Sequence, residues 1–174
     1  TDQSGASAST EFSIDVQKVT VGASPDGYIQ GATLFADADE DGVLGAGEAF
    51  TLTDADGDFL LVGGTGTLVM SGGTDISTDR PFAGRFLAPD DSTVLSPVTT
   101  LIALVDDDAG TDTAAAQGYV ANALGLPSGV DFTTFDQIAA TLSGNPVTAA
   151  QGEVVSAVTI KLQNTALQAG GALV

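Results

Sequence analysis

The chain has 174 residues, enough for one large domain or two small ones, and its 23 acidic and 4 basic residues give a formal net charge of −19. So acidic a chain repels nucleic acid and anionic lipid surfaces, and no apolar run reaches the roughly 18 residues of a membrane span, so we expect no nucleic-acid partner and no membrane insertion. The chain has no histidine and no cysteine, so it cannot build the usual Ser-His-Asp, Cys-His or zinc centres, and we expect a protein that is not an enzyme.

The N-terminal part has the pattern of β-strands. Residues 1–10 are small and polar, and we expect a disordered lead or linker there. From residue 11 to residue 21 apolar and polar residues alternate, with one slip, which predicts a strand. A turn is predicted at 24–27, and the apolar run that follows predicts a second strand over 28–35.

This second strand leads into an acidic loop with regular spacing. Residues 37–48 read D-x-D-x-D-G-x-x-x-x-x-E, which is the twelve-position calcium loop of EF-hands. Carboxylates occupy positions 1, 3, 5 and 12, and the glycine that the sharp turn needs occupies position 6. We therefore predict a Ca²⁺ site, and an acidic solvated loop is the alternative. The predicted ligands are Asp37, Asp39, Asp41, the backbone carbonyl of Val43, and Glu48 as the bidentate ligand.

A second acidic segment follows a short strand predicted over 48–53. Residues 54–58 read D-A-D-G-D, which favours a plain Asp-Gly hairpin turn. Because three carboxylates lie on five residues, a second metal site is the alternative, with ligands Asp54, Asp56 and Asp58. Further strands are predicted over 59–62, 63–70 and 81–88, and a polar loop over 74–80.

After residue 88 the apolar spacing becomes helical. Ser96 followed by Pro97 predicts the N-cap and first residue of a helix that ends at the acidic run 106–110. We expect Thr111 to cap a second helix, which Gly125 ends. Residue 133 or 134 is expected to cap a third helix. Its predicted apolar face is Phe135, Ile138, Ala139 and Leu142. A long fourth helix is predicted from 147 onward, with one face made of Val147, Val154, Val155, Val158 and Leu162.

Strands followed by helices predict an α+β fold. We expect a lead at 1–10, a calcium-binding β-sandwich at 11–88 and a helical domain of three to four helices at 89–174, either packed together or loosely linked. Arg80 and Arg85 are the only arginines, and in so acidic a chain we expect both to pair with carboxylates. Tyr28 is expected to be half-buried on a strand.

The stretch 26–35, the loop 37–48 and the turn 53–59 together resemble the small calcium-binding β-sandwich modules of bacterial surface proteins. These are the SdrD-B-like and carboxypeptidase-regulatory-like (prealbumin-type) modules of large secreted adhesins. The resemblance covers about 45 residues of the β part. It implies an Ig-like or prealbumin-type antiparallel β-sandwich, an extracellular or cell-surface location, and the loop ligands given above.

Three functions are consistent with these features. We expect a structural module that uses calcium as a clip and serves adhesion or scaffolding, with neighbouring modules, copies of itself, or a glycan or peptide as partners. The first alternative is a self-assembling subunit of an extracellular filament, matrix or surface layer. The second is a calcium sensor or buffer, which the strand-like flanks of the loop disfavour because sensor loops lie between helices.

Overall fold

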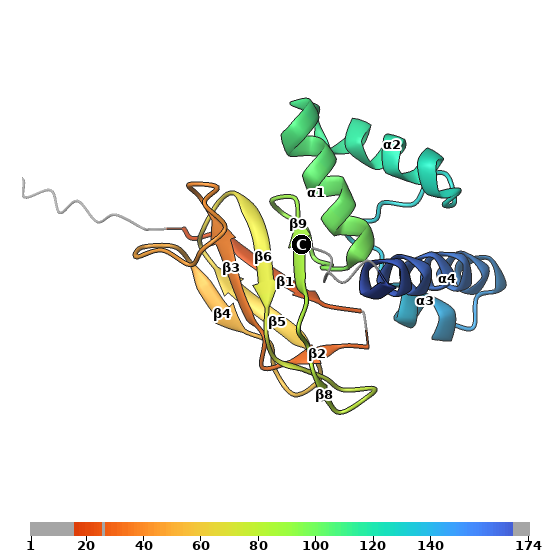
Figure 1. The fold of residues 1–174 in the computed structure, drawn as a ribbon, viewed down its shortest axis with the longest axis horizontal. Helices are drawn as coiled ribbons and strands as arrows, with labels where there is room; N and C mark the ends of the chain where they lie inside the picture. The colour runs from red at the N-terminus through yellow and green to blue at the C-terminus, as the bar shows by residue number, and fades with distance from the viewer. Residues whose placement is uncertain (1–15, 26, 169–174) are drawn as a thin grey trace, which may run out of the picture.

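The computed structural model describes residues 16–25 and 27–168. The expected lead at 1–10, the beginning of the first expected strand and the apolar C-terminal residues 169–174 lie outside this range. Within it the chain is α+β, with nine strands followed by four helices, and Figure 1 shows the strands grouped beside the helices. The sequence prediction of strands first and helices second is confirmed.

The strands form three antiparallel sheets. The largest has the order β4-β3-β6-β9, the second pairs β1 with β5, and the third has the order β2-β7-β8. The bounds are β1 Val19–Ala23, β2 Ile29–Gln30, β3 Thr33–Asp37, β4 Phe50–Leu52, β5 Asp58–Val62, β6 Thr67–Ser71, β7 Thr74–Asp75, β8 Arg80–Pro81 and β9 Arg85–Ala88. The polar stretch predicted as a loop over 74–80 contains β7 and the start of β8, because these two short strands pair with each other.

The core of the β half lies between the four-stranded sheet and β5. Alternate residues of β5 are buried, namely Phe59 and Leu61, while Leu60 and Val62 are exposed. This period-two pattern turns one face of the strand toward the interior. The buried cluster consists of Ile29, Ala32, Leu34, Ala36, Phe59, Leu61, Leu68, Met70, Phe86, Ala88 and Leu95.

The first helix begins where the sequence predicts. The helices are α1 Pro97–Ala109, α2 Thr113–Leu124, α3 Gln137–Leu142 and α4 Pro146–Gln168. Ser96 caps α1, with a capping box to Thr99 and proline at the first position, and Gly110 ends the helix in the left-handed conformation. Gly125 ends α2 in the same way.

Two predicted N-caps are wrong. Asp112, not Thr111, caps α2 by accepting a hydrogen bond from the backbone N–H of Ala115. Asp136, rather than residue 133 or 134, caps α3 by accepting from the N–H groups of Ile138 and Ala139. Aspartate is as good an N-cap as threonine or better, so the residue that starts each helix is set by the geometry of the preceding loop.

The helical half has its own core. It consists of Val98, Ile102, Ala116, Val120, Leu126, Phe132 and Val155. On α4 the buried face contains Val155, with Val158 and Leu162 against it, whereas Val147 and Val154 are exposed. The apolar face predicted for the third helix is observed only in part. Phe135, just before α3, packs against this core, but Gln137 and Ala140 are the buried residues of the helix and Leu142 is 78 % exposed. A helix of six residues has too few turns for its spacing to define a face.

The two halves are packed against each other. Helix α1 lies along β9 (Figure 1), and the hydroxyl of Thr99 donates a hydrogen bond to the carbonyl of Leu87, whose N–H donates to the hydroxyl of Thr100. The buried side chain of Gln137 donates to the carbonyl of Pro25, joining α3 to the loop after β1. Of the alternatives left open by the sequence, packing of the halves is therefore the observed one.

In the described part of the chain, none of the helices combines the length and apolar character needed to cross a membrane.

Candidate metal centre

The predicted calcium loop connects two neighbouring strands of the largest sheet. β3 ends at Asp37, the first position of the loop, and β4 begins at Phe50, two residues after the last position. The two strands pair antiparallel, with Phe35 opposite Phe50. Both flanks of the loop are therefore strands, as the sequence predicted.

Three of the predicted ligands converge. One carboxylate oxygen from each of Asp37, Asp39 and Glu48 lies within 4.8 Å of the others. A hard cation such as Ca²⁺ is bound by oxygen ligands at about 2.3–2.6 Å, so oxygens on opposite sides of one ion are separated by up to about 5 Å. The three carboxylates therefore have the spacing of a single cation site.

Asp37 is the anchor of this cluster. Its side chain is only 4 % exposed, although aspartate is rarely buried without a partner. One oxygen, Oδ2, accepts a hydrogen bond from the N–H of Gly42 at 2.8 Å, while Oδ1 is buried and has no hydrogen-bond partner. An ionised oxygen buried without a partner is costly, and a bound cation would remove that cost.

Glu48 closes the loop from the other end. Its Oε1 accepts from the N–H of Ala38 at 2.8 Å and its Oε2 accepts from the N–H of Gly45 at 2.7 Å. These two hydrogen bonds tie the Glu48 carboxylate to the backbone at positions 2 and 9 of the loop, and one of its oxygens belongs to the converging group. Since a carboxylate oxygen has two lone pairs, each can accept a hydrogen bond and also bind a metal ion.

The other two predicted ligands are not part of the converging group. Asp41 directs Oδ1 to the N–H of Val43 at 2.7 Å, which forms a local turn, and its carboxylate is absent from the group of three. Val43 is 65 % exposed, and only its backbone carbonyl could contribute. The turn itself requires left-handed conformations at Glu40, with φ of 60°, and at Gly42, with φ of 74°.

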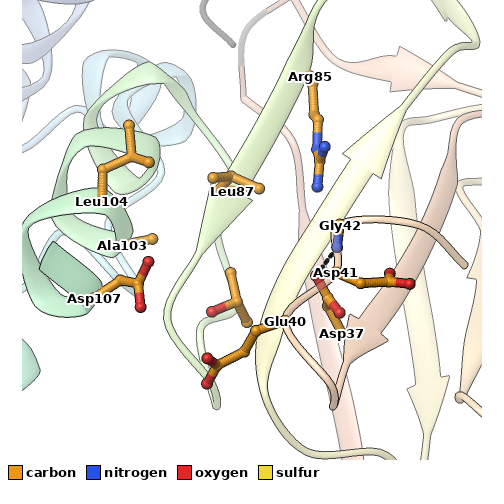
Figure 2. Close-up of a pocket in the computed structure, with 10 residues that line it drawn as sticks. Asp37, Glu40, Asp41, Gly42, Arg85, Leu87, Ala103, Leu104 and Asp107 are labelled. Atoms are coloured by element: carbon orange, nitrogen blue, oxygen red, sulfur yellow. Dashed lines mark hydrogen bonds between the residues drawn. The ribbon is translucent and has the colours of Figure 1, made fainter.

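A cavity of about 160 Å³ lies beside the loop, between the large sheet and α1. Figure 2 shows Arg85 extending from β9 toward Gly42, with Asp107 of α1 on the other side of the cavity. The lining residues are Asp37, Glu40, Asp41, Gly42, Thr67, Arg85, Leu87, Ala103, Leu104 and Asp107. No local pattern in the sequence places Arg85 at the loop, because Gly42 and Arg85 are 43 positions apart and meet only through the pairing of β3, β6 and β9.

The expected ion pairs of the arginines are not observed. Among the described residues, the ion pairs of basic side chains are those of Lys18 with Asp90 and Asp91, and neither Arg80 nor Arg85 takes part in one. Burial lowers the pKa of Lys18, but hydrogen bonds to these two carboxylates outweigh it, so the pKa is raised. Lys18 therefore connects the start of β1 to the segment before α1.

The second acidic segment, at 54–58, has a different geometry. Asp54 Oδ1 accepts from the N–H groups of Asp56 at 2.9 Å and Asp58 at 3.0 Å, so this carboxylate is used within its own turn. Within the described residues, the three aspartates of the turn do not bring their oxygens together as the loop does. Burial raises the pKa of Asp58, and the charges of Asp54, Asp56 and Asp136 raise it further.

Tyr28 connects this turn region to the helical half. It lies just before β2, with φ of 52°, rather than inside a strand as expected, and it is half-buried as expected. Its hydroxyl donates a hydrogen bond to Asp136 Oδ2 at 3.0 Å. Burial, this hydrogen bond and the nearby carboxylates raise the pKa of Tyr28 to about 12.

Comparison with known proteins adds no relative: no protein-family model, no curated protein and no solved structure matches this chain.

Proposed function

We propose that the loop at 37–48 binds Ca²⁺ and that the protein is a non-enzymatic structural module whose β half is clipped by this ion. The observation that carries the proposal is the unpartnered, buried Oδ1 of Asp37 within a group of three converging carboxylates. Asp39 and Glu48 complete the proposed side-chain set, and Asp41 and the carbonyl of Val43 are ligands if the loop tightens on binding. Ca²⁺ fits better than Mg²⁺ because flexible carboxylate geometry suits the larger ion.

The proposed role of the ion is to clip two strands, since the loop joins β3 directly to β4. A sensor loop works by changing the angle between two helices, and no helix flanks this loop. Binding to the folded state alone raises its stability by mass action. With a dissociation constant of about 10⁻⁴–10⁻³ M, the range of extracellular modules, 10 mM Ca²⁺ adds about 1.4–2.7 kcal/mol.

The wider setting that we propose is adhesion or scaffolding at a bacterial cell surface or outside the cell. A calcium clip of this affinity is filled only where calcium is millimolar, as it is outside cells. The two sheets that share one core agree with a β-sandwich of the Ig-like or prealbumin type. Glycans, peptides or neighbouring modules are the proposed partners.

The first test is a calcium titration of metal-stripped protein by isothermal calorimetry, together with melting curves in 10 mM Ca²⁺ and in chelator. We expect one site of about 10⁻⁴–10⁻³ M and a melting temperature about 3–10 °C higher with calcium, since 1 kcal/mol moves a domain of this size by about 2–4 °C. Absence of binding and of a shift would refute the calcium clip.

A second candidate function, self-assembly, is favoured by one separate observation. The outward face of the β1–β5 pair carries Val19, Val21, Leu60 and Val62, which are between 46 % and 58 % exposed. Val19 lies opposite Val62, and Val21 opposite Leu60, so the four side chains form one apolar strip. Exposed apolar strips of this kind are typical of contact surfaces between proteins.

Light scattering on a sizing column separates the two candidates. A clipped module is expected to remain monomeric with calcium, whereas a self-assembling subunit is expected to form larger species. Leu60→Asp would abolish assembly through the β1–β5 strip, and Ile160→Asp, at an exposed position of α4, is the control that would not. Calcium-dependent assembly that Leu60→Asp abolishes would favour the second candidate.

A further inference from the structure

Arg85 rests on the metal loop. A Cβ atom added to Gly42, at position 6 of the loop, would lie 2.6 Å from Nη2 and 3.0 Å from Nη1 of Arg85. The guanidinium therefore lies against the backbone at the sharpest turn of the loop (Figure 2). Only glycine leaves room for this contact.

The surroundings of Arg85 are acidic. Four carboxylates line the same cavity, and Arg85 is the only basic residue among its lining residues. No carboxylate oxygen of a described residue lies within ion-pair distance of it, and its Nε is buried without a hydrogen-bond partner. Among the described side chains the charge of Arg85 therefore has no single carboxylate partner, and it lies in a cavity that four carboxylates line, those of Asp37, Glu40, Asp41 and Asp107.

The position of Arg85 is set by the helical half. Arg85 is the first residue of β9, paired with Ser71 of β6, and lies two residues before Leu87 on the same face of the strand. The backbone of Leu87 is held by hydrogen bonds to the hydroxyls of Thr99 and Thr100 at the start of α1. Docking of α1 on β9 thus fixes where the guanidinium meets the loop.

From these contacts we infer that Arg85 is a positioning residue that regulates the metal loop. In the metal-free protein its positive charge offsets the repulsion among the loop carboxylates and supports the turn at Gly42. When Ca²⁺ binds, the same charge opposes the ion and lowers its affinity. The loop has five carboxylates between residues 37 and 48, and Arg85 thereby keeps its calcium affinity in the weak range that suits an extracellular clip. This inference rests on the proposed calcium site.

The experiment compares the full-length wild type with Arg85→Met, Arg85→Lys and Arg80→Met. Methionine keeps an unbranched side chain of similar length without the charge, lysine keeps the charge, and Arg80→Met removes the same charge at the exposed position in β8. Calcium affinity is measured by calorimetry in low salt and in 1 M NaCl, and melting is measured in chelator.

For Arg85→Met we expect calcium binding about three- to tenfold tighter in low salt, with the difference largely lost in 1 M NaCl, where charges are screened beyond about 3 Å. We also expect it to melt lower than the wild type in chelator and low salt. Arg85→Lys should restore most of the wild-type affinity, and Arg80→Met should match the wild type. If Arg85 acted only by packing, Arg85→Met would lower both the melting temperature and the calcium affinity, and Arg85→Lys would not restore the affinity.

Each other outcome is decisive as well. If the wild type binds calcium but Arg85→Met binds it equally or more weakly, the inference is overturned while the calcium site stands. If Arg80→Met tightens binding as much as Arg85→Met, the effect comes from net charge and the inference is also overturned. If Arg85→Met does not fold, Arg85→Gln replaces it as the variant without the charge, and the same salt-sensitive gain in calcium affinity over the wild type and Arg85→Lys is expected. If the wild type does not bind calcium, both the proposed function and this inference fail.

Discussion

Two acidic segments flank the same short strand, β4, and they differ in what their carboxylates do. In the loop before β4, three carboxylates converge and the buried Oδ1 of Asp37 has no donor. In the turn after β4, Asp54 uses one oxygen to accept two backbone N–H groups of its own turn. Both segments have the composition of a metal site. The difference shows that carboxylates converging around a buried oxygen without a donor, rather than the density of acids, distinguish a candidate site from a turn.

Alanine substitution of the glycine at each bend is expected to change the unfolding free energy most, and by different amounts in the two segments. Gly57 has φ of 81°, and an added Cβ would lie 2.7 Å from Tyr28 Cβ and 3.0 Å from the N of Ile29. Because backbone neighbours cannot move aside, Gly57→Ala is expected to cost about 2–4 kcal/mol of unfolding free energy. Gly42→Ala meets the end of the flexible Arg85 side chain and should cost only about 1–2 kcal/mol.

Urea unfolding of both variants in chelator measures these costs. The expected difference in cost would show that the turn is rigid and that the loop can adapt to the added methyl group. A Gly42→Ala variant as unstable as Gly57→Ala would show that the loop is already rigid without a metal.

The effect of calcium on stability should also distinguish the two segments. Asp37→Asn and Glu48→Gln are each expected to abolish the calcium-dependent gain of about 1.4–2.7 kcal/mol, because each removes a charged ligand from the converging group. Asp58→Asn in the turn should retain the gain. Melting curves with and without 10 mM Ca²⁺ give the comparison. Loss of the calcium-dependent stabilisation in Asp58→Asn would show that the calcium site, or a second one, lies in the turn.

The stability of the turn region is expected to depend on pH rather than on calcium. Because the folded pKa of Tyr28 is about 12 and that of an unfolded tyrosine is about 10, its contribution is intact below about pH 10 and is lost as the pH rises toward 12. Tyr28→Phe removes the hydrogen bond to Asp136 and should cost about 1 kcal/mol. Absorbance titration of Tyr119→Phe follows Tyr28 alone, and a midpoint near 10 would contradict the buried contact.

The smallest effect is expected at Asp56, the exposed middle residue of the turn. Asp56→Asn should change stability by less than about 0.5 kcal/mol, as is usual for exposed surface positions. It should also leave calorimetric calcium stoichiometry at the wild-type value. A fall from two ions to one would instead establish the second site at Asp54, Asp56 and Asp58.

Elements with local signals were predictable from the sequence. The apolar strand β5, the Ser96-Pro97 start of α1 and the glycine that ends α2 are set by residues close together in the chain. The short pair β7 and β8 could not be read from its polar sequence, because each strand has only two residues and is defined by its partner. The predicted N-caps of α2 and α3 were wrong for a related reason, since a threonine and an aspartate lie within two positions of each other at both starts.

The candidate site was predictable in part. The loop spacing placed Asp37, Asp39 and Glu48 correctly in one group, because twelve consecutive residues carry the pattern. It did not show that Asp41 turns to the N–H of Val43. Nor could it show that Arg85 meets the loop, since that contact depends on the order of strands across the large sheet.

The position of Leu95 has a consequence for the order of events during protein synthesis. This residue follows the last strand by seven positions, yet it is fully buried in the core of the β half. Ser24 and Ala23 also bond to its backbone. A chain still emerging from the ribosome therefore cannot complete its β half when residue 88 has appeared. It must wait until Leu95, two residues before α1 begins, has emerged, so the β half is expected to become stable only as synthesis reaches the helical half.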